Sequence, residues 1–273
     1  MQRLSLFSVL LLTVGIVSCG SGDGESQASA NDSANNAGGG GGSEPAAEAP
    51  KAEAQPWDAS KGTASVTGTI KFEGDPPKVR KVDMGSDEHC QEMNAEGVMD
   101  EGAIIAADGG LQNVFVYVQK GLSDWTFTAP SETASLSQEG CTYKPHVLGV
   151  QVGQTLIIEN ADAVTHNIHS FGKKNKTFNQ TQGKGGADLE VVFKKTEVFI
   201  PVKCDIHGWM NTYIGVVDNP FYAISAADGS FDLGKLPAGT YTIAARHEGF
   251  GLQKQEITIG DGESKSIAFS FSE

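Results

Sequence analysis

The sequence predicts an all-β protein, and two observations support this. Apolar and polar side chains alternate over short segments such as residues 66–72, which is the period of a half-buried strand. Turn sequences such as Asp228-Gly229 separate these segments, and no long stretch has helical periodicity. Only short helical turns are expected, near residues 87–94. Strands at this spacing favour a β-sandwich.

Composition limits the kinds of partner. The chain has 273 residues, with 20 Lys and Arg against 34 Asp and Glu, and a net charge of −14. This balance argues against nucleic acid, because phosphate binding needs clustered basic residues. Residues 61–273 carry −9 of this charge, so a basic protein partner is plausible. The alternative is that the acidic surface serves only solubility.

The N-terminus has the pattern of a targeting segment. In residues 1–18, Arg3 precedes an apolar run too short to span a bilayer comfortably, which is typical of a signal peptide. Residues 16–19 resemble a bacterial lipobox, which implies a lipoprotein whose first mature residue, Cys19, carries lipid. We expect export to the periplasmic side of the cell envelope with a membrane anchor. Gly20, in the position where Asp retains some lipoproteins in the inner membrane, favours the outer membrane. The alternative to a lipobox is an ordinary signal peptide that is followed by Cys19.

Residues 19–60 are expected to form a disordered linker. They are rich in Gly, Ala and Glu, with a glycine run at 38–42. Apart from Trp57 they hold no large apolar side chain that a core could bury.

The segment that carries chemistry is a Cys-x2-His-x2-Met motif at the end of a predicted strand. It consists of Cys204, His207 and Met210, and two further histidines, His166 and His169, lie upstream. A thiolate, two imidazoles and a thioether are the ligand set of a blue copper site, with the Met as a weak axial ligand. The alternative is a buried structural thiol with Met210 as core filler. Zinc is a weaker alternative, because Met is a poor ligand for it.

These motifs support a resemblance to a known family. Residues 129–217 resemble a cupredoxin, and the short ligand loop is most similar to that of amicyanin. Residues 148–156 match the strand that enters the family's sheet, residues 165–168 its His-Asn motif, and residues 213–217 its last strand. The resemblance implies a Greek-key β-sandwich with one type 1 copper site. Its implied ligands are His166, Cys204, His207 and Met210.

The resemblance also assigns the neighbours of these ligands. Residues three apart in a strand point to opposite faces, and the family match selects His166 rather than His169 as the ligand. Asn167 is then expected to hold the two ligand segments together by hydrogen bonds. We expect His207 to be exposed on its loop, beside an apolar patch with Trp209, and to be the exit for the electron.

The four cysteines are assigned by elimination. If Cys19 carries lipid and Cys204 binds metal, Cys90 and Cys141 remain and are expected to pair in an oxidising compartment. This disulfide would join the region before the cupredoxin to its first strand. The alternative gives Cys90, with His89, to a second metal site.

The flanking segments form a second expected domain. Residues 219–273 resemble the second half of a carboxypeptidase regulatory-like domain, a small transthyretin-like β-sandwich, and residues 62–125 could supply the first half. The cupredoxin, residues 129–217, would then be inserted into one sandwich with a structural or adhesive role. Residues 246–248 are interpreted as surface charge. His146 is left open, as a structural residue or a neighbour of the copper.

The function expected from these residues is one-electron transfer. The partner would be a redox protein such as a c-type cytochrome or an oxidase. No catalytic constellation stands out, so no enzymatic activity is expected. Two alternatives remain: a lipoprotein that buffers or delivers copper, and a cell-envelope binding module in which the metal is structural.

Overall fold

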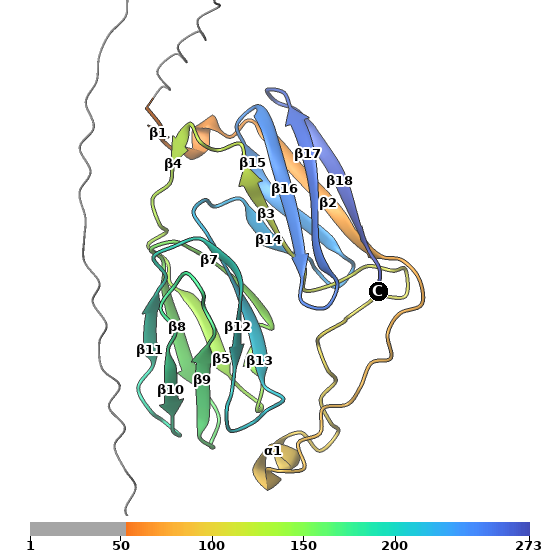
Figure 1. The fold of residues 1–273 in the computed structure, drawn as a ribbon, viewed down its shortest axis with the longest axis vertical. Coiled ribbons are helices and arrows are strands. Elements are labelled where there is room, and N and C mark those ends of the chain that lie inside the picture. The colour runs from red at the N-terminus through yellow and green to blue at the C-terminus, as the bar shows by residue number, and fades with distance from the viewer. Residues whose placement is uncertain (1–52) are drawn as a thin grey trace, which may run out of the picture. The chain divides into compact units, whose positions relative to one another are not determined.

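Figure 1 shows the computed structural model, which describes residues 53–273. The predicted signal peptide, Cys19 and most of the linker lie outside these residues. Almost all regular structure is strand, which confirms the predicted class. The elements are β1 (Gln55–Pro56), η1 (Ala59–Lys61, a 3-10 helix), β2 (Ala64–Phe72), α1 (Glu88–Met93), β3 (Phe115–Lys120), β4 (Trp125–Thr126), β5 (Ala134–Gln138), β6 (Tyr143–Lys144), β7 (Val147–Gln151), β8 (Thr155–Asn160), β9 (His166–Ser170), β10 (Asn179–Gln182), β11 (Leu189–Val192), β12 (Glu197–Lys203), β13 (Asn211–Val217), β14 (Tyr222–Ile224), β15 (Ser230–Leu236), β16 (Gly239–His247), β17 (Gly251–Ile259) and β18 (Ser264–Phe271). Within residues 53–273, neither helix is long and apolar enough to cross a membrane.

Residues 134–217 fold into two sheets, which we call the inserted sandwich (Figure 1). One sheet has the order β10-β9-β12-β13-β7 and the other the order β11-β8-β5-β6. The alternating pattern places Leu156 and Ile158 of one sheet against Ile168 and Ile214 of the other, all fully buried. The apolar faces of the two sheets therefore share one core.

The strands before and after this segment pair with each other and form the flanking sandwich. Its sheets have the orders β14-β3-β16-β17 and β15-β2-β18. Strand β2 pairs in parallel with β18 over eight residues, from Ser65 beside Ser264 to Phe72 beside Phe271. Residues close to the two ends of the described chain therefore lie in one sheet.

The two sandwiches touch through aromatic rings that lie over glycines. A Cβ added at Gly149 of β7 would lie 2.2 Å from the Tyr222 ring, and one at Gly215 of β13 would lie 2.5 Å from the Phe115 ring. Side chains larger than hydrogen would push these rings away. The glycines thus allow β3 and β14 of the flanking sandwich to approach the inserted sandwich closely.

The folded part begins earlier than the linker prediction allowed. Strand β1 pairs in parallel with β4, although residues up to 60 were expected to be disordered. The cause is the one large apolar side chain of that segment. Trp57 packs 5.2 Å from Trp125 and 5.3 Å from Phe221, measured between ring centroids.

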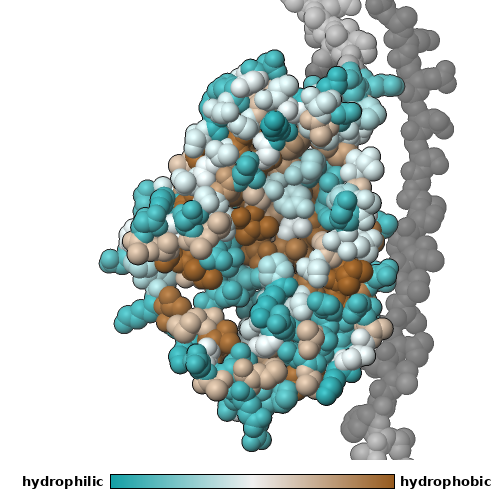
Figure 2. All heavy atoms as spheres, turned by 180° about the vertical axis from the view of Figure 1, so that it is seen from behind, coloured by the Kyte–Doolittle hydropathy of each residue, from teal (hydrophilic) through white to brown (hydrophobic). Residues whose placement is uncertain are grey.

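A long connection, residues 73–113, joins β2 to β3; we call it the cover segment. It contains α1, whose start is capped by the Asp87 carboxylate accepting the Cys90 N–H at 2.9 Å. This confirms the short helix expected near residues 87–94. Figure 2 shows a hollow in the face turned away from the viewer in Figure 1. Residues within 98–105 of the cover segment and within 139–146 of the inserted sandwich line a cavity.

Candidate metal centre

Three predicted ligands converge at one end of the inserted sandwich. His166 opens β9, Cys204 follows β12, and His207 lies in the loop between β12 and β13. The Nδ1 atoms of His166 and His207 are 2.9 Å apart, and the Cys204 Sγ is 3.9 Å from the His207 Nδ1. All three donor atoms lie within 4.8 Å of one another, and all three residues are buried.

The fourth predicted ligand is held by the loop itself. The Cys204 N–H donates to the Met210 carbonyl at 3.1 Å, and the Met210 N–H donates to the His207 carbonyl at 2.9 Å. These bonds fold the motif into a tight turn and bring Met210 back beside Cys204. Met210 is 1% exposed and packs in the same core cluster as Cys204.

Backbone N–H groups point at the sulfur. The N–H groups of Asn167 and His207 donate to the Cys204 Sγ at 3.4 and 3.3 Å. The Asn167 side-chain oxygen also accepts the Asp205 N–H at 2.9 Å. Asn167 therefore ties the two ligand segments together, and both N–H groups stabilise negative charge on the sulfur.

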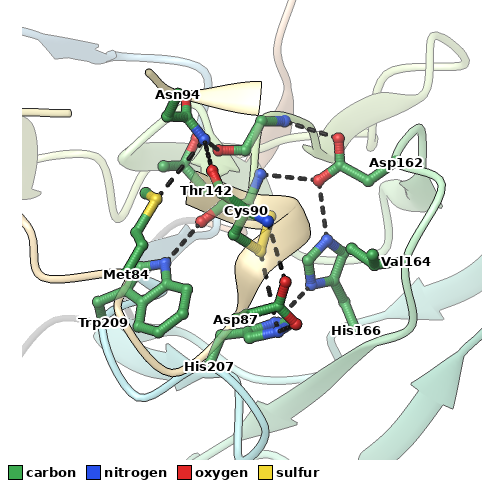
Figure 3. Close-up of a disulfide and its surroundings, with 12 residues drawn as sticks. Met84, Asp87, Cys90, Asn94, Thr142, Asp162, Val164, His166, His207 and Trp209 are labelled. Atoms are coloured by element: carbon green, nitrogen blue, oxygen red, sulfur yellow. Dashed lines mark hydrogen bonds and ion pairs between the residues drawn. A yellow bond between two sulfur atoms is a disulfide. The ribbon is translucent and has the colours of Figure 1, made fainter. Parts of the chain in front are cut away.

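Asp162 holds the far nitrogen of the first imidazole. Its Oδ2 lies 2.8 Å from the His166 Nε2, and the carboxylate also accepts the N–H groups of Gly140 and Cys141 at 2.7 Å (Figure 3). Burial lowers the pKa of His166, and the Asp162 carboxylate opposes this only in part. With Nε2 bound to Asp162, Nδ1 is directed at the centre.

A second carboxylate, from the cover segment, holds the other imidazole. The Asp87 Oδ2 lies 3.2 Å from the His207 Nε2 (Figure 3). The Cys90 N–H, and after it His207, lower the pKa of Asp87. His207 is only 2% exposed. The expectation of an exposed His207 is therefore wrong, because α1 lies over it. Trp209 is also half-buried, and its indole N–H donates to the Cys141 carbonyl at 3.0 Å.

The remaining cysteines form a disulfide between α1 and the inserted sandwich. Cys90 and Cys141 are bonded across 51 residues of sequence. Cys90 therefore has no thiolate to offer a second metal site with His89, and that alternative is wrong. Among residues 53–273, Cys204 is the one free cysteine.

Two other histidines lie apart from the donors. His169 points to the opposite face of β9, with its Nδ1 3.1 Å from the Asp205 carboxylate. His146 is buried and bonded to the Glu248 carboxylate. Burial alone would lower the pKa of His146, but Glu248 raises it above its usual value. His247 is 1% exposed, so the interpretation of residues 246–248 as surface charge is wrong.

Sequence reasoning missed both carboxylates. Asp162 lies four residues before His166 and could have been found from the rule that a ligating imidazole donates its other N–H to a carboxylate. Asp87 lies 120 residues from His207. Its only local signal was that of a helix cap.

The donors fit copper. One thiolate and two imidazoles directed by Asp162 and Asp87 combine soft sulfur with nitrogen, and Met210 is buried in the same core cluster as the thiol. The inserted sandwich thus has the two-sheet architecture, and the gathered Cys and His donors, that the resemblance to a cupredoxin implied.

Comparisons with known proteins gave matches among solved structures only. No family model and no curated protein sequence matches the chain. Solved structures that match include a Cu-containing nitrite reductase from Thermus scotoductus, at 21% identity and a TM-score of 0.30, covering 32% of this chain and 23% of the reductase. A purple cupredoxin from Nitrosopumilus maritimus matches at 26% identity and a TM-score of 0.26, covering 30% of this chain and 98% of that protein. A Cu(I) amicyanin variant matches at 19% identity and a TM-score of 0.28, covering 33% and 96%. The chain thus spans less than a quarter of the reductase, and each similarity is confined to about a third of this chain.

Proposed function

We propose that this chain is a type 1 copper protein that carries single electrons in the cell envelope, anchored by lipid on Cys19. The observation that carries the proposal is the convergence of the buried donors of His166, Cys204 and His207. Copper bound there supplies one-electron chemistry by cycling between Cu(II) and Cu(I). The partner is a redox protein such as a c-type cytochrome or an oxidase, and the chain itself catalyses no reaction.

The residues of the chain keep this centre rigid. His166 and Cys204 come from neighbouring antiparallel strands, where Ser170 pairs with Val202. One carboxylate fixes each imidazole, and two N–H groups fix the sulfur. A buried centre with fixed ligands changes little between oxidation states, which suits a carrier.

The same geometry disfavours copper delivery. Handing over a metal requires ligands that a recipient can reach and replace. His207 lies beneath Asp87 and α1 at 2% exposure, and Cys204 is 3% exposed. Rapid exchange is therefore not expected.

A glycan-binding module is also disfavoured. Such a module needs an exposed aromatic platform, and all three tryptophans are partly buried. Trp57 and Trp125 pack against each other, and Trp209 packs 5.0 Å from the His207 ring.

The test is to load the full chain with Cu(II) and record its visible absorption and EPR spectra. We expect an intense thiolate-to-copper band that Cys204→Ser abolishes. His166→Gln should abolish it as well, whereas His169→Gln, three residues along the same strand, is the matched control and should keep it. A colourless protein, or a band that survives Cys204→Ser, contradicts the proposal. Transfer of Cu(I) to a chelator within seconds would favour delivery.

A further inference from the structure

Two loops at the edge of the inserted sandwich are joined by side chains. Residues 171–178 follow β9, and residues 193–196 precede β12. The Asn175 side-chain oxygen accepts the N–H groups of Lys194 and Lys195 at 2.9 and 3.0 Å. The Glu197 carboxylate accepts the N–H groups of Lys174 and Asn175 at 3.0 and 2.8 Å. The two loops are therefore held side by side.

This arrangement gathers positive charge on an acidic protein. The two loops contain five exposed lysines and no acidic residue, while the chain as a whole carries −14. No ion pair found in residues 53–273 involves any of the five. Glu197, the nearest acid in sequence, already accepts backbone N–H groups. We call these lysines the lysine rim: Lys173, Lys174, Lys176, Lys194 and Lys195.

Along the chain, an aromatic pair on and just after β9 lies between the ligand His166 and the first residue of the lysine rim. The rings of His169 and Phe171 stack with centroids 4.1 Å apart, and Phe171 is 40% exposed. His169 is bonded to Asp205, the residue after Cys204, and Ile206, which follows, is 51% exposed. We call His169, Phe171 and the lysine rim together the His169 face. The His169 side chain is 28% exposed in the described structure, whereas the ligand His207 is 2% exposed.

We propose that the electron partner docks on the His169 face and presents an acidic surface to it. This inference rests on the proposed function and adds the place and charge of the encounter. An apolar centre with a charged rim is the usual build of a transient interface. Opposite charges steer the encounter, and the acidic remainder of this chain repels an acidic partner that arrives elsewhere. Net charge alone suggested a basic partner, but the local charge points to the opposite.

The first test measures electron transfer from the Cu(I)-loaded full chain to hexacyanoferrate(III), an anionic stand-in for the partner. Each Cu(I) gives one electron and becomes Cu(II), and the trianion becomes a tetraanion. The double variant Lys173→Glu/Lys174→Glu should slow this reaction about 10-fold at low salt. The matched control, Lys235→Glu/Lys254→Glu in the flanking sandwich, makes the same charge change at two exposed lysines and should slow it less than about 3-fold. Equal slowing by both variants overturns the proposal.

The second test does not depend on copper chemistry. Hexacyanochromate(III) is an inert paramagnetic anion that broadens NMR signals where it binds. We expect broadening of the amides of residues 169–176 and 194–195, in copper-free protein as well. If the chain fails to bind copper, the proposed function is contradicted, but the set of broadened amides still tests the docking site. Broadening centred on Trp209 and α1 overturns the docking site.

A third test, with lipid vesicles, distinguishes contact of the lysine rim with a membrane from docking of an acidic protein. The full chain is mixed with vesicles of equal parts phosphatidylglycerol and phosphatidylcholine. If Lys173→Glu/Lys174→Glu abolishes vesicle binding but leaves electron transfer to hexacyanoferrate(III) unchanged, the lysine rim is a membrane contact and the proposal is overturned. If vesicle binding is the same for both double variants, docking of an acidic protein is supported.

Discussion

The two sandwiches share an architecture but differ in what they bury. The core of the flanking sandwich is built almost entirely of apolar side chains. Of the fifteen buried polar residues in the described chain, eleven lie between residues 134 and 217, in the inserted sandwich. Buried polar groups lower stability unless they are hydrogen-bonded. A concentration of them in one sandwich therefore indicates a functional role for that sandwich. The comparison locates the chemistry in one sandwich and makes the other a support.

The part of the chain outside the inserted sandwich also contributes to the metal centre. The cover segment leaves the flanking sandwich after β2 and brings Asp87 to the His207 imidazole. The metal centre is thus completed by a part of the chain outside the sandwich that holds its ligands. The predictions below test how far the two sandwiches depend on each other.

One of the two largest effects on stability is expected from breaking the disulfide between the cover segment and the inserted sandwich. Cys90→Ala/Cys141→Ala removes a disulfide that closes a loop of 51 residues, and losing such a link typically costs about 2–4 kcal/mol of unfolding free energy. The cover segment should then move away from His207, so that the Cys204 thiol reacts faster with a labelling reagent. Urea denaturation and thiol labelling of copper-free protein measure both. An unchanged labelling rate would show that the cover segment stays in place without the disulfide.

Cavities in each core are expected to lower stability by a similar amount. Leu156→Ala in the inserted sandwich and Ile243→Ala in the flanking sandwich each truncate a fully buried side chain, and each should lower the unfolding free energy by about 2–5 kcal/mol. Because Tyr222 and Phe115 pack on Gly149 and Gly215, we expect one shared unfolding transition that both variants lower. Urea denaturation followed by tryptophan fluorescence and circular dichroism provides the measurement. Two separate transitions, each sensitive to one variant, would make the sandwiches independent.

A pH effect on stability is expected from His247 of the flanking sandwich. Burial lowers the pKa of His247 from 6.5 to about 4, so the native state keeps this imidazole neutral. Between these two values the unfolded chain binds more protons. The unfolding free energy should therefore fall as the pH falls from 6.5 to 4, by up to about 3 kcal/mol. Denaturation at several pH values should show this slope reduced in His247→Phe and retained in His169→Gln. If both variants show the same slope, the decrease in unfolding free energy at low pH comes from groups other than His247.

The smallest effect on stability is expected at Asp87. Asn caps a helix about as well as Asp, so Asp87→Asn should change the unfolding free energy by less than about 0.5 kcal/mol. It removes a negative charge beside His207, and this charge favours Cu(II) over Cu(I). The reduction potential of the copper-loaded protein should therefore rise. Potentiometry measures this rise, and Glu88→Gln at the exposed neighbouring residue is the control. An equal rise in reduction potential for Glu88→Gln would show that the change in net charge alone causes the effect.

The sequence predicted what depends on local pattern. Alternation marked the strands, and the spacing of Cys204, His207 and Met210 marked a turn that backbone bonds close. The opposite orientations of His166 and His169 also follow from the two-residue period of a strand. Asp87 and the exposure of His207 could not be predicted, because they depend on how the cover segment crosses the molecule. The same holds for the lysine rim, whose two loops lie some twenty residues apart in sequence.

The parallel pairing of β2 with β18 also sets the order in which the chain can fold. Every strand of the inserted sandwich lies within residues 134–217, so this unit can close as soon as that stretch has emerged. Strand β2 lies between β15 and β18, and almost two hundred residues of sequence separate it from β18. Such distant pairings form slowly, because the intervening chain must first be brought together. During synthesis, the inserted sandwich with the candidate metal centre is therefore completed first, while β2 keeps an open edge until β18 has been made.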